Sequence, residues 1–257
     1  MLSTVELEAK EALVAAGITG PHKSHSRHNA ITNIRALVAG DPDKLFGMKT
    51  PTDYTPSDVL GFLAEVTGCS PDIEDTHGSD TIDPDLTVRA VVSAAQRLAE
   101  FADQGARMCI VTGHPTGLLE HHIHVARAYA AAGGTVVRLA EGRRFSFARG
   151  RAEVRYTAGV GCYADGASLV HTHGPECMEA MLEAEPYPDL VFGDHGFVGA
   201  AISRGIPAIA VMDINDPALA VAHAENRDVI VVPMDDNRLP ASYRPSWELF
   251  AHVLEGR

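Results

Sequence analysis

The sequence has few cysteines and no long apolar run, and both absences narrow what the protein can be. Its four cysteines, Cys69, Cys109, Cys162 and Cys177, show no C-x-x-C spacing, which argues against a zinc ribbon and against a disulfide framework. No stretch approaches the ~18 consecutive apolar residues of a membrane span. Residues 1–17 predict an amphipathic acidic helix without the apolar centre of a signal peptide. We therefore expect a soluble protein of a reducing compartment, the cytoplasm.

Positive charge is also scarce. Lys and Arg number 21 against 34 Asp and Glu, so the net charge is −13. An acidic chain repels a phosphate backbone, and the only clear basic run, between Arg143 and Arg155, is short and typical of a solvated hairpin. Nucleic acid is therefore not an expected partner. A small anionic substrate remains compatible with the sequence, because a pocket can be locally positive or hold a metal.

The pattern of the 257 residues changes near position 105. Before it, the sequence predicts helices over 4–16, 30–39, from 55 onward and over 85–102. After it, short apolar runs alternate with helical segments, and a hairpin is expected over 143–156. The expected strands are 108–111, 135–139, 168–171, 190–192, 208–211 and 229–232. The expected helices between them include 115–132, 175–185 and 197–204.

Short apolar strands that alternate with helices indicate a parallel sheet with both faces covered. We therefore predict an α/β fold with a Rossmann-like, mostly parallel sheet and helices on both faces over 105–257. Residues 1–104 are predicted to form an N-terminal helical cap.

The loops after the predicted strands carry most of the chemically active side chains. In an open α/β sheet, ligands bind at the carboxyl ends of the strands. Connecting loops are usually polar, but here His, Asp, Asn or Glu stand beside Gly or Pro in five consecutive loops. These loops are 112–117, 172–176, 193–196, 212–217 and 233–237. This density of potential ligands at one edge predicts a functional site.

Oxygen ligands for a divalent cation stand in two of these loops. Asp194 lies in a glycine-flanked segment, and Asp213, Asn215 and Asp216 follow another strand. Their hard oxygen atoms suit Mg²⁺ or Mn²⁺. The alternative for the second loop is an Asx turn with a helix N-cap. An EF-hand calcium loop is excluded, because its sixth and twelfth positions are both alanine here.

The chain has 13 histidines, and several are candidates for proton transfer. His195 and His173 follow predicted strands, and imidazole titrates near neutral pH, so either can serve as general acid or base. His121 and His124 share a face of a predicted helix. Because the H-E-x-x-H motif is absent, we expect those two to form a solvated or partly packed cluster rather than a zinc site.

Substrate contacts are expected from the flanking loops. The backbone of Thr112 and Gly113, with His114, opens a helix and can hold phosphate or sugar hydroxyls, although no P-loop lysine and no full G-x-G-x-x-G pattern is present. A polar segment near the N-terminus can clamp an anion or form a flexible surface loop. Its candidate residues are Arg27, His28 and Asn29. Further candidates, each also compatible with an ordinary acidic turn or first helical turn, are Glu176, Asp236 and Asn237.

One segment matches a nucleophile signature without its context. Residues 83–87 fit D-x-D-x-T of the haloacid dehalogenase phosphatases, whose chemistry needs these aspartates at the end of a buried strand. Residues 75–82 are polar and Asp83-Pro84 is typical of a helix start, so we interpret the match as a helix cap. The C-x₅-R, R-H-G and G-x-S-x-G motifs are absent, which excludes three further hydrolase mechanisms.

Four segments together resemble a small, largely actinobacterial group of phosphatases, some of which belong to nucleoside-antibiotic pathways. The segments are 111–119, 193–201, 213–218 and 232–237. The similarity covers about 105–245, with fainter likeness at 27–29 and 40–42. It implies the reaction class without assigning catalytic roles. A more distant likeness, at the level of the fold, is to metal-dependent carbohydrate-phosphate phosphatases.

The strand-end residues and the resemblance agree on hydrolysis of a phosphomonoester. We predict a metal-dependent phosphatase for a small phosphorylated nucleoside or sugar, with Mg²⁺ or Mn²⁺ held by Asp194, Asp213, Asp216 and Asn215. The alternative is a non-catalytic sugar- or nucleotide-binding module with the same loops. An NAD-dependent enzyme is disfavoured by the missing glycine fingerprint. A membrane partner is not expected, and homo-oligomerisation is left open.

Overall fold

The computed structural model describes residues 2–147, 150–183 and 187–256, which form alternating helices and strands. The helices are α1 (Thr4–Ala16), α2 (Arg27–Val38), α3 (Pro42–Leu45), α4 (Pro56–Thr67), α5 (Pro84–Asp103), α6 (Pro115–Ala131), α7 (Glu176–Met181), α8 (His195–Ser203), α9 (Pro217–Ala224) and α10 (Arg244–Glu255). The strands are β1 (Gly20–Pro21), β2 (Thr81–Ile82), β3 (Arg107–Thr112), β4 (Thr135–Val136), β5 (Arg144–Phe147), β6 (Gly150–Thr157), β7 (Val160–Ala164), β8 (Leu190–Asp194), β9 (Ala208–Met212) and β10 (Val229–Pro233).

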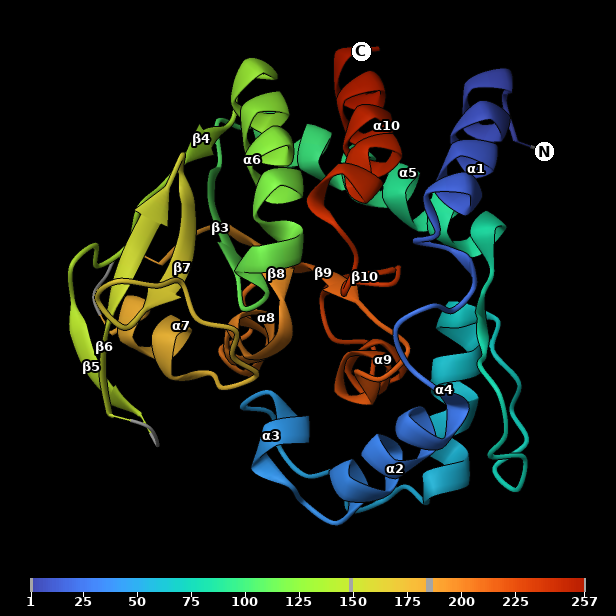
Figure 1. Cartoon of the computed structure of the whole chain (residues 1–257). Helices are drawn as coiled ribbons and strands as arrows, with labels where there is room; N and C mark the ends of the chain where they lie inside the picture. Colours follow the sequence, from blue (N-terminus) through green and yellow to red (C-terminus); the bar gives the residue numbers. More distant parts are fainter. Residues whose placement is uncertain (1, 148–149, 184–186, 257) are drawn as a thin grey trace.

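One large sheet organises the described residues (Figure 1). Its strand order is β10-β9-β8-β3-β7-β6-β5, and β4 pairs with the start of β3. All pairs from β10 to β7 are parallel, whereas β6 and β5 are antiparallel. The prediction of a mostly parallel sheet with helices on both faces is therefore confirmed. Because the central strands are parallel, their carboxyl ends lie at the same edge.

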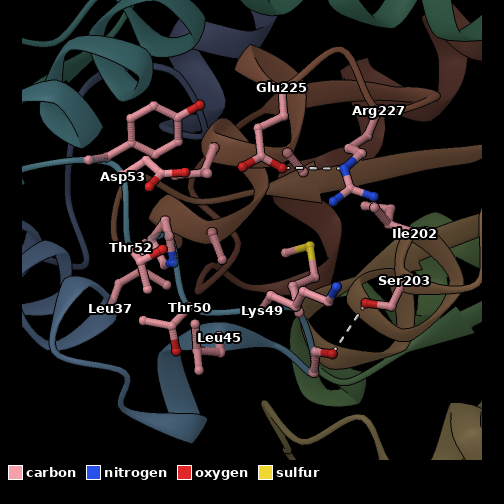
Figure 2. A pocket seen from close by; sticks show the side chains of 17 residues that line it. Leu37, Leu45, Lys49, Thr50, Thr52, Asp53, Ile202, Ser203, Glu225 and Arg227 are labelled. Atoms are coloured by element: carbon pink, nitrogen blue, oxygen red, sulfur yellow. Dashed lines mark hydrogen bonds and ion pairs between the residues drawn. The ribbon is translucent and has the colours of Figure 1, made fainter.

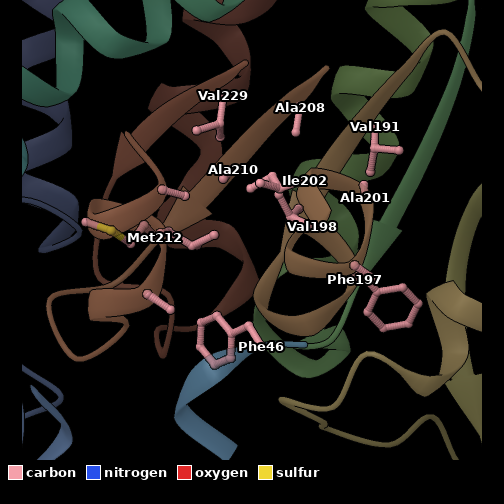
Figure 3. Packing of buried hydrophobic residues seen from close by; sticks show 14 of the residues in the cluster. Phe46, Val191, Phe197, Val198, Ala201, Ile202, Ala208, Ala210, Met212 and Val229 are labelled. Atoms are coloured by element: carbon pink, nitrogen blue, oxygen red, sulfur yellow. The ribbon is translucent and has the colours of Figure 1, made fainter. Parts of the chain in front are cut away.

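Alternation along the strands divides the interior into two cores. On β3, Met108 and Ile110 belong to a core with α1, α5, α6 and α10, while Cys109 and Val111 belong to a core with α2, α4, α7, α8 and α9. This is the two-residue period of a strand with both faces buried. Figure 3 shows part of the second core, where Val198 and Ile202 of α8 lie beside apolar residues of the sheet.

Residues 1–104 contribute to both cores. α1 and α5 cover one face with α6 and α10, and α2 and α4 contact α9 on the other face. Leu13 and Val88 thus share a core with the sheet, as do Ile34 and Leu60 on the opposite side. Residues before and after the predicted boundary at 104 therefore pack in the same two cores.

One predicted strand is wrong. Residues 168–171 form only a single antiparallel bridge, between Ala164 and Leu169, and the strand next to β3 is β7, at Val160–Ala164. Strand β7 was not predicted because it contains glycine and cysteine, which interrupt its run of large apolar residues. The predicted hairpin turn at Arg149 and the predicted helix end at Glu185 lie outside the described residues. All four cysteines are buried and free, and no described helix has the length and apolar character needed to cross a membrane.

The D-x-D-x-T match lies at the start of α5, as the sequence predicts. Asp83 is the N-cap, and its carboxylate accepts hydrogen bonds from the backbone N–H of Asp85 and Leu86. The Thr87 hydroxyl donates to the carbonyl of Pro233 at 2.7 Å.

The cap formed by Asp83 can be tested by substitution. We expect Asp83→Ala to lower the free energy of unfolding by about 1 kcal/mol, and Asp83→Asn to preserve most of that free energy, since asparagine also caps. Urea denaturation measures both values. A nucleophile at Asp83 would give the opposite pattern, with phosphate release abolished in both variants and stability unchanged.

Candidate active site

Histidine and aspartate side chains gather where the carboxyl ends of β3, β8, β9 and β10 meet. The strand-end residues are His114 after β3, Asp194 and His195 at the β8–α8 junction, Asp213 and Asp216 after β9, and Asp235 and Asp236 after β10. Two other segments add His22 and His25, between β1 and α2, and His171 and His173, after β7. We call these eleven residues the His/Asp cluster.

His195 lies at the centre of the cluster and is 2% exposed. Its backbone has a φ of 46°, a left-handed conformation that is costly for a residue with a side chain and is found at functional sites. Its Nε2 atom lies 3.3 Å from Asp236 Oδ2 and 3.5 Å from Asp216 Oδ2. The next residue, Gly196, passes so close to the carbonyl of His173 that a Cβ would overlap it. The sharp β8–α8 turn therefore aims the imidazole at two carboxylates.

Asp194 lies behind His195 and orients it. Asp194 Oδ1 is 2.8 Å from His195 Nδ1 and accepts a hydrogen bond from the Gly113 N–H at 2.7 Å. Its other oxygen lies 3.4 Å from His122 Nε2. A carboxylate that holds Nδ1 leaves Nε2 of the same ring free to bind a metal. Asp194 was predicted as a metal ligand, but the structure places it outside the three groups of neighbouring ligand atoms described below.

A buried series of hydrogen-bonding side chains continues behind Asp194. His122 Nδ1 lies 3.2 Å from His121 Nδ1, and His121 Nε2 lies 3.0 Å from the hydroxyl of Ser246 in α10. His121, which was expected to form a solvated or partly packed cluster with His124, is fully buried, as is His122. Their place in α6 thus anchors the site to the helix layer behind the sheet. His124 instead stacks on Trp247, with ring centroids 4.5 Å apart.

The cluster contains three groups of potential metal ligands. Within each group, the ligand atoms lie within 4.8 Å of one another. The groups are His195 with Asp216 and Asp236, His114 with His171 and His195, and His22 with Asp213 and Asp235. In the third group, His22 Nε2 lies 2.6 Å from Asp213 Oδ1 and 3.8 Å from Asp235 Oδ2. His25 Nε2 approaches the other oxygen of Asp213 at 3.5 Å.

Burial shifts the pKa values of this cluster strongly. It raises the pKa of Asp213 to about 8 and that of Asp216 to about 7, against the opposing effects of His22 and His195. Burial opposes a charged His195, but Asp216, Asp194 and Asp236 together raise its pKa to about 10. Near neutral pH, protons on Asp213 and Asp216 therefore compensate part of the buried negative charge. Burial and the neighbouring histidines lower the pKa of His171 to about 4, which leaves its ring neutral.

The predicted phosphate loop is occupied by contacts within the protein. The N–H of Gly113 donates to Asp194, and the N–H of His114 donates to the hydroxyl of Thr112, which is fully buried. These N–H groups are thus not free for phosphate, and only the His114 side chain joins the cluster. Its Nδ1 atom lies 3.5 Å from Asp236 Oδ2.

Of the residues predicted to clamp an anion, Arg27 is engaged by other parts of the protein. Arg27 is 2% exposed, and its Nη1 atom lies 2.6 Å from both carboxylate oxygens of Asp80. Its other nitrogens donate to backbone carbonyls in the loop before β2, among them that of Ser70 at 3.1 Å. His28 is exposed and Asn29 half-buried at the start of α2. Arg27 therefore holds a loop in place.

The remaining candidates lie partly at the surface and partly inside the cluster. Asn237 is exposed, and Asn215 is half-buried with a side-chain oxygen that has no hydrogen-bond partner among the described atoms. Glu176 lines a cavity beside the cluster, as does His173. Asp216, expected to cap α9 under the alternative, makes no side-chain cap and faces His195. Asp213 accepts from the N–H of Ile214 as well as facing His22.

Sequence reasoning did not select several members of the site. The candidate residues did not include His22, His25, His171 or the supporting His122, and Asp235 was considered only with its neighbours, as a further ligand or part of an acidic turn. The H-x-x-H spacing of His22 and His25 was the available signal, but both lie in a loop of the N-terminal half, far in sequence from the sheet edge. His171 and Asp235 each stand two residues or fewer from a selected position.

Two cavities are candidates for substrate binding, and one of them adjoins the cluster. One, of about 530 Å³, is lined by His171, His173 and Glu176 and adjoins the cluster. The other, of about 460 Å³, lies between the segment after α3 and helices α8 and α9, and Figure 2 shows Lys49 and Arg227 among its lining residues. It contains no member of the His/Asp cluster, so the first cavity is the one relevant to chemistry.

Buried His and Asp groups at the carboxyl edge of an α/β sheet are typical of hydrolases that use divalent cations. A model of the family described as Phosphatase matches residues 3–256. A phosphatase of Streptomyces coelicolor is 38% identical over 242 residues, which cover 92% of this chain and 90% of that relative. The chain therefore belongs to the Phosphatase family. This membership confirms the resemblance drawn from the sequence and the predicted class, a phosphatase.

The contacts of Arg27 generate a test of its role. Because it forms a buried ion pair with Asp80, we expect Arg27→Met and Asp80→Asn each to lower the free energy of unfolding by about 3–5 kcal/mol. The double variant should lose less than the sum, since no single charge is left unpaired. Urea denaturation of the four proteins measures the coupling. A stable Arg27→Met protein with a raised KM for phosphate esters would instead support the anion clamp.

Proposed function

We propose that this chain is a metal-dependent phosphatase that hydrolyses a small phosphomonoester, a phosphorylated sugar or nucleoside. The observation that carries this proposal is the set of three neighbouring ligand groups at the carboxyl edge of the sheet. A phosphate ester carries negative charge, whereas five members of the cluster are buried aspartates and none is Lys or Arg. Such a site attracts phosphate only when cations neutralise the carboxylates.

Buried atoms without a hydrogen bond support cation binding. His114 Nδ1, Asp213 Oδ2 and Asp236 Oδ2 are buried and make no hydrogen bond within the described residues, only ion-pair contacts of 3.3–3.5 Å with one another, with His195 or with His25. A buried polar atom without a hydrogen bond costs about 1–3 kcal/mol, and a carboxylate costs more. Burial, followed by the nearby Asp236, raises the pKa values of Asp213 and Asp216, so added positive charge is needed to hold both side chains ionised. A divalent ion bound by His195, Asp216 and Asp236, and a second bound by His22, Asp213 and Asp235, would meet this need.

The donor atoms bear on the identity of the metal. Each group combines imidazole nitrogen with carboxylate oxygen or consists of imidazoles alone. Mg²⁺ prefers oxygen ligands and usually keeps several waters, while imidazole suits transition ions. Of the two ions expected from the sequence, Mn²⁺ therefore fits this donor set better, and Zn²⁺ fits it as well.

The residues around the metal sites have distinct roles in the proposed hydrolysis. A bound divalent ion supplies charge that neutralises phosphate oxygens and lowers the pKa of a water molecule. Asp194 fixes the ring of His195, and the strained β8–α8 turn fixes its direction. His173 stacks on His195 with ring centroids 4.7 Å apart, and its Nδ1 lies 3.1 Å from Asp43 Oδ2. It borders the adjoining cavity, and because burial and His195 lower its pKa, its neutral ring can accept a proton there as a general base.

Removal of metal provides the first test. After exhaustive chelation and removal of the chelator, we expect the protein to release no phosphate from para-nitrophenyl phosphate, and added Mn²⁺ or Zn²⁺ to restore release. Elemental analysis of the untreated protein gives the metal content. Persistent turnover by metal-free protein would contradict the metal dependence. Ligand binding without turnover across a broad panel of esters would favour a binding module.

Substitution separates a ligand from an orienting residue. We expect Asp236→Asn and Asp213→Asn to lose metal and turnover. The metal-free Asp213→Asn protein should melt at higher temperature above about pH 8, where Asp213 itself would be ionised, because burial disfavours that charge. The metal-free Asp236→Asn protein should show no such gain, because His114 and His195 hold the pKa of Asp236 below its usual range despite its burial. Asp194→Asn should retain the ligands but weaken metal affinity by about 10- to 100-fold. Asp228→Asn, at a surface position with a side chain 59% exposed, is the matched control. Metal titration and melting curves with and without metal measure these effects. Unchanged metal dependence in Asp236→Asn and Asp213→Asn would remove both from the site.

A further inference from the structure

The cavity of about 530 Å³ adjoins the cluster at its histidines. His171, which lines it, stacks on His114 with ring centroids 4.3 Å apart. His173 lines it too, and stacks on His195. A phosphate bound beside His114 and His195 would therefore direct the rest of its ester into this cavity.

The size of the cavity suits a small molecule. Pockets that bind small ligands measure roughly 300–1,000 Å³. Its walls come from the start of α3, from residues 170–175 and from the first turn of α7, with Tyr163 of β7 at one side. Such walls can enclose a leaving group of the size of a sugar or a nucleoside.

The charged groups of the cavity are carboxylates, and its described lining residues include no Lys or Arg. Asp43 is compensated, because Lys44 Nζ lies 2.7 Å and His173 Nδ1 3.1 Å from its Oδ2 atom. Glu176 has no hydrogen-bond or ion-pair partner among the described residues, and it is half-buried. Its carboxylate lies over the backbone of Gly174, where a Cβ would collide with it. Glycine at 174 thus makes room for a carboxylate that nothing else engages.

We propose that the substrate is the phosphate ester of an uncharged, hydroxyl-rich alcohol and that Glu176 selects it. This inference rests on the proposed phosphatase function and narrows its substrate class. An ionised carboxylate only accepts hydrogen bonds, so it pairs with the hydroxyl groups of a sugar or ribose. The same charge repels a carboxylate or a second phosphate on the leaving group, and no Lys or Arg among the described residues of the cavity wall offsets that repulsion. Glu176 is therefore a specificity-determining residue.

Matched esters test this selection in the metal-loaded, full-length protein. Glycerol 3-phosphate and 3-phosphoglycerate differ by one hydroxymethyl group replaced by a carboxylate, and fructose 6-phosphate and fructose 1,6-bisphosphate differ by one phosphate. We expect kcat/KM to be at least about tenfold higher for the uncharged member of each pair, which corresponds to ~1.4 kcal/mol. Glu176→Gln should reduce this ratio through the KM of the anionic ester, and Glu176→Lys should reduce it further.

Glu179→Gln is the matched control, because Glu179 is exposed and lies one turn further along α7. It should leave the ratio unchanged. Equal kcat/KM for both members of each pair, or an unchanged ratio in Glu176→Gln, would overturn the inference while para-nitrophenyl phosphate is still hydrolysed. Absence of turnover on every ester, including para-nitrophenyl phosphate, would overturn the proposed function and the inference with it.

Discussion

Five carboxylates buried side by side are the constraint on which this structure depends. Asp194, Asp213, Asp216, Asp235 and Asp236 are each at most 3% exposed. Like charges in a medium of low dielectric repel strongly, so the fold must place a compensating group against each of them. Histidines do so for Asp194, Asp213, Asp216 and Asp236, with contacts between 2.6 and 3.5 Å, and the hydroxyl of Ser24 donates to Asp235 at 2.6 Å. The parallel sheet concentrates the charges, and the surrounding segments neutralise them.

The fold was largely predictable because it follows from local pattern. The strands β8, β9 and β10 are short apolar runs with both faces buried, and each was expected within a few residues of its observed bounds. The exception, β7, contains Gly161 and Cys162, and a strand with so few branched residues carries a weak signal. The strand-end rule then located Asp213, Asp216 and Asp236 correctly at the edge of the sheet.

The roles of the individual site residues depend on tertiary contacts and could not be predicted from the sequence. Nothing in the sequence separates Asp194, which holds a histidine, from Asp216, which faces the Nε2 atom of the same ring. The glycines of the predicted phosphate loop indicated an anion site, yet the N–H of Gly113 donates a hydrogen bond to Asp194. Arg27 stood beside histidines in the sequence, but the loop before β2 engages its guanidinium. For Gly113 and Arg27 the deciding partner lies more than 40 residues away in the sequence.

The N-terminal segment completes the site rather than covering an independent one. His22 pairs with Asp213, and the N–H of Lys23 and the hydroxyl of Ser24 both bind Asp235, so the turn between β1 and α2 compensates two carboxylates of the sheet. The side chain of Asn33 in α2 then donates to the carbonyl of Asn215 at 2.9 Å, inside the loop that carries Asp213 and Asp216. If the sheet formed without this segment, Asp213 and Asp235 would lack these partners, at a cost of about 1–3 kcal/mol or more for each. The two parts of the chain therefore stabilise one another at the place where the chemistry is expected, and folding of the core is coupled to assembly of the site.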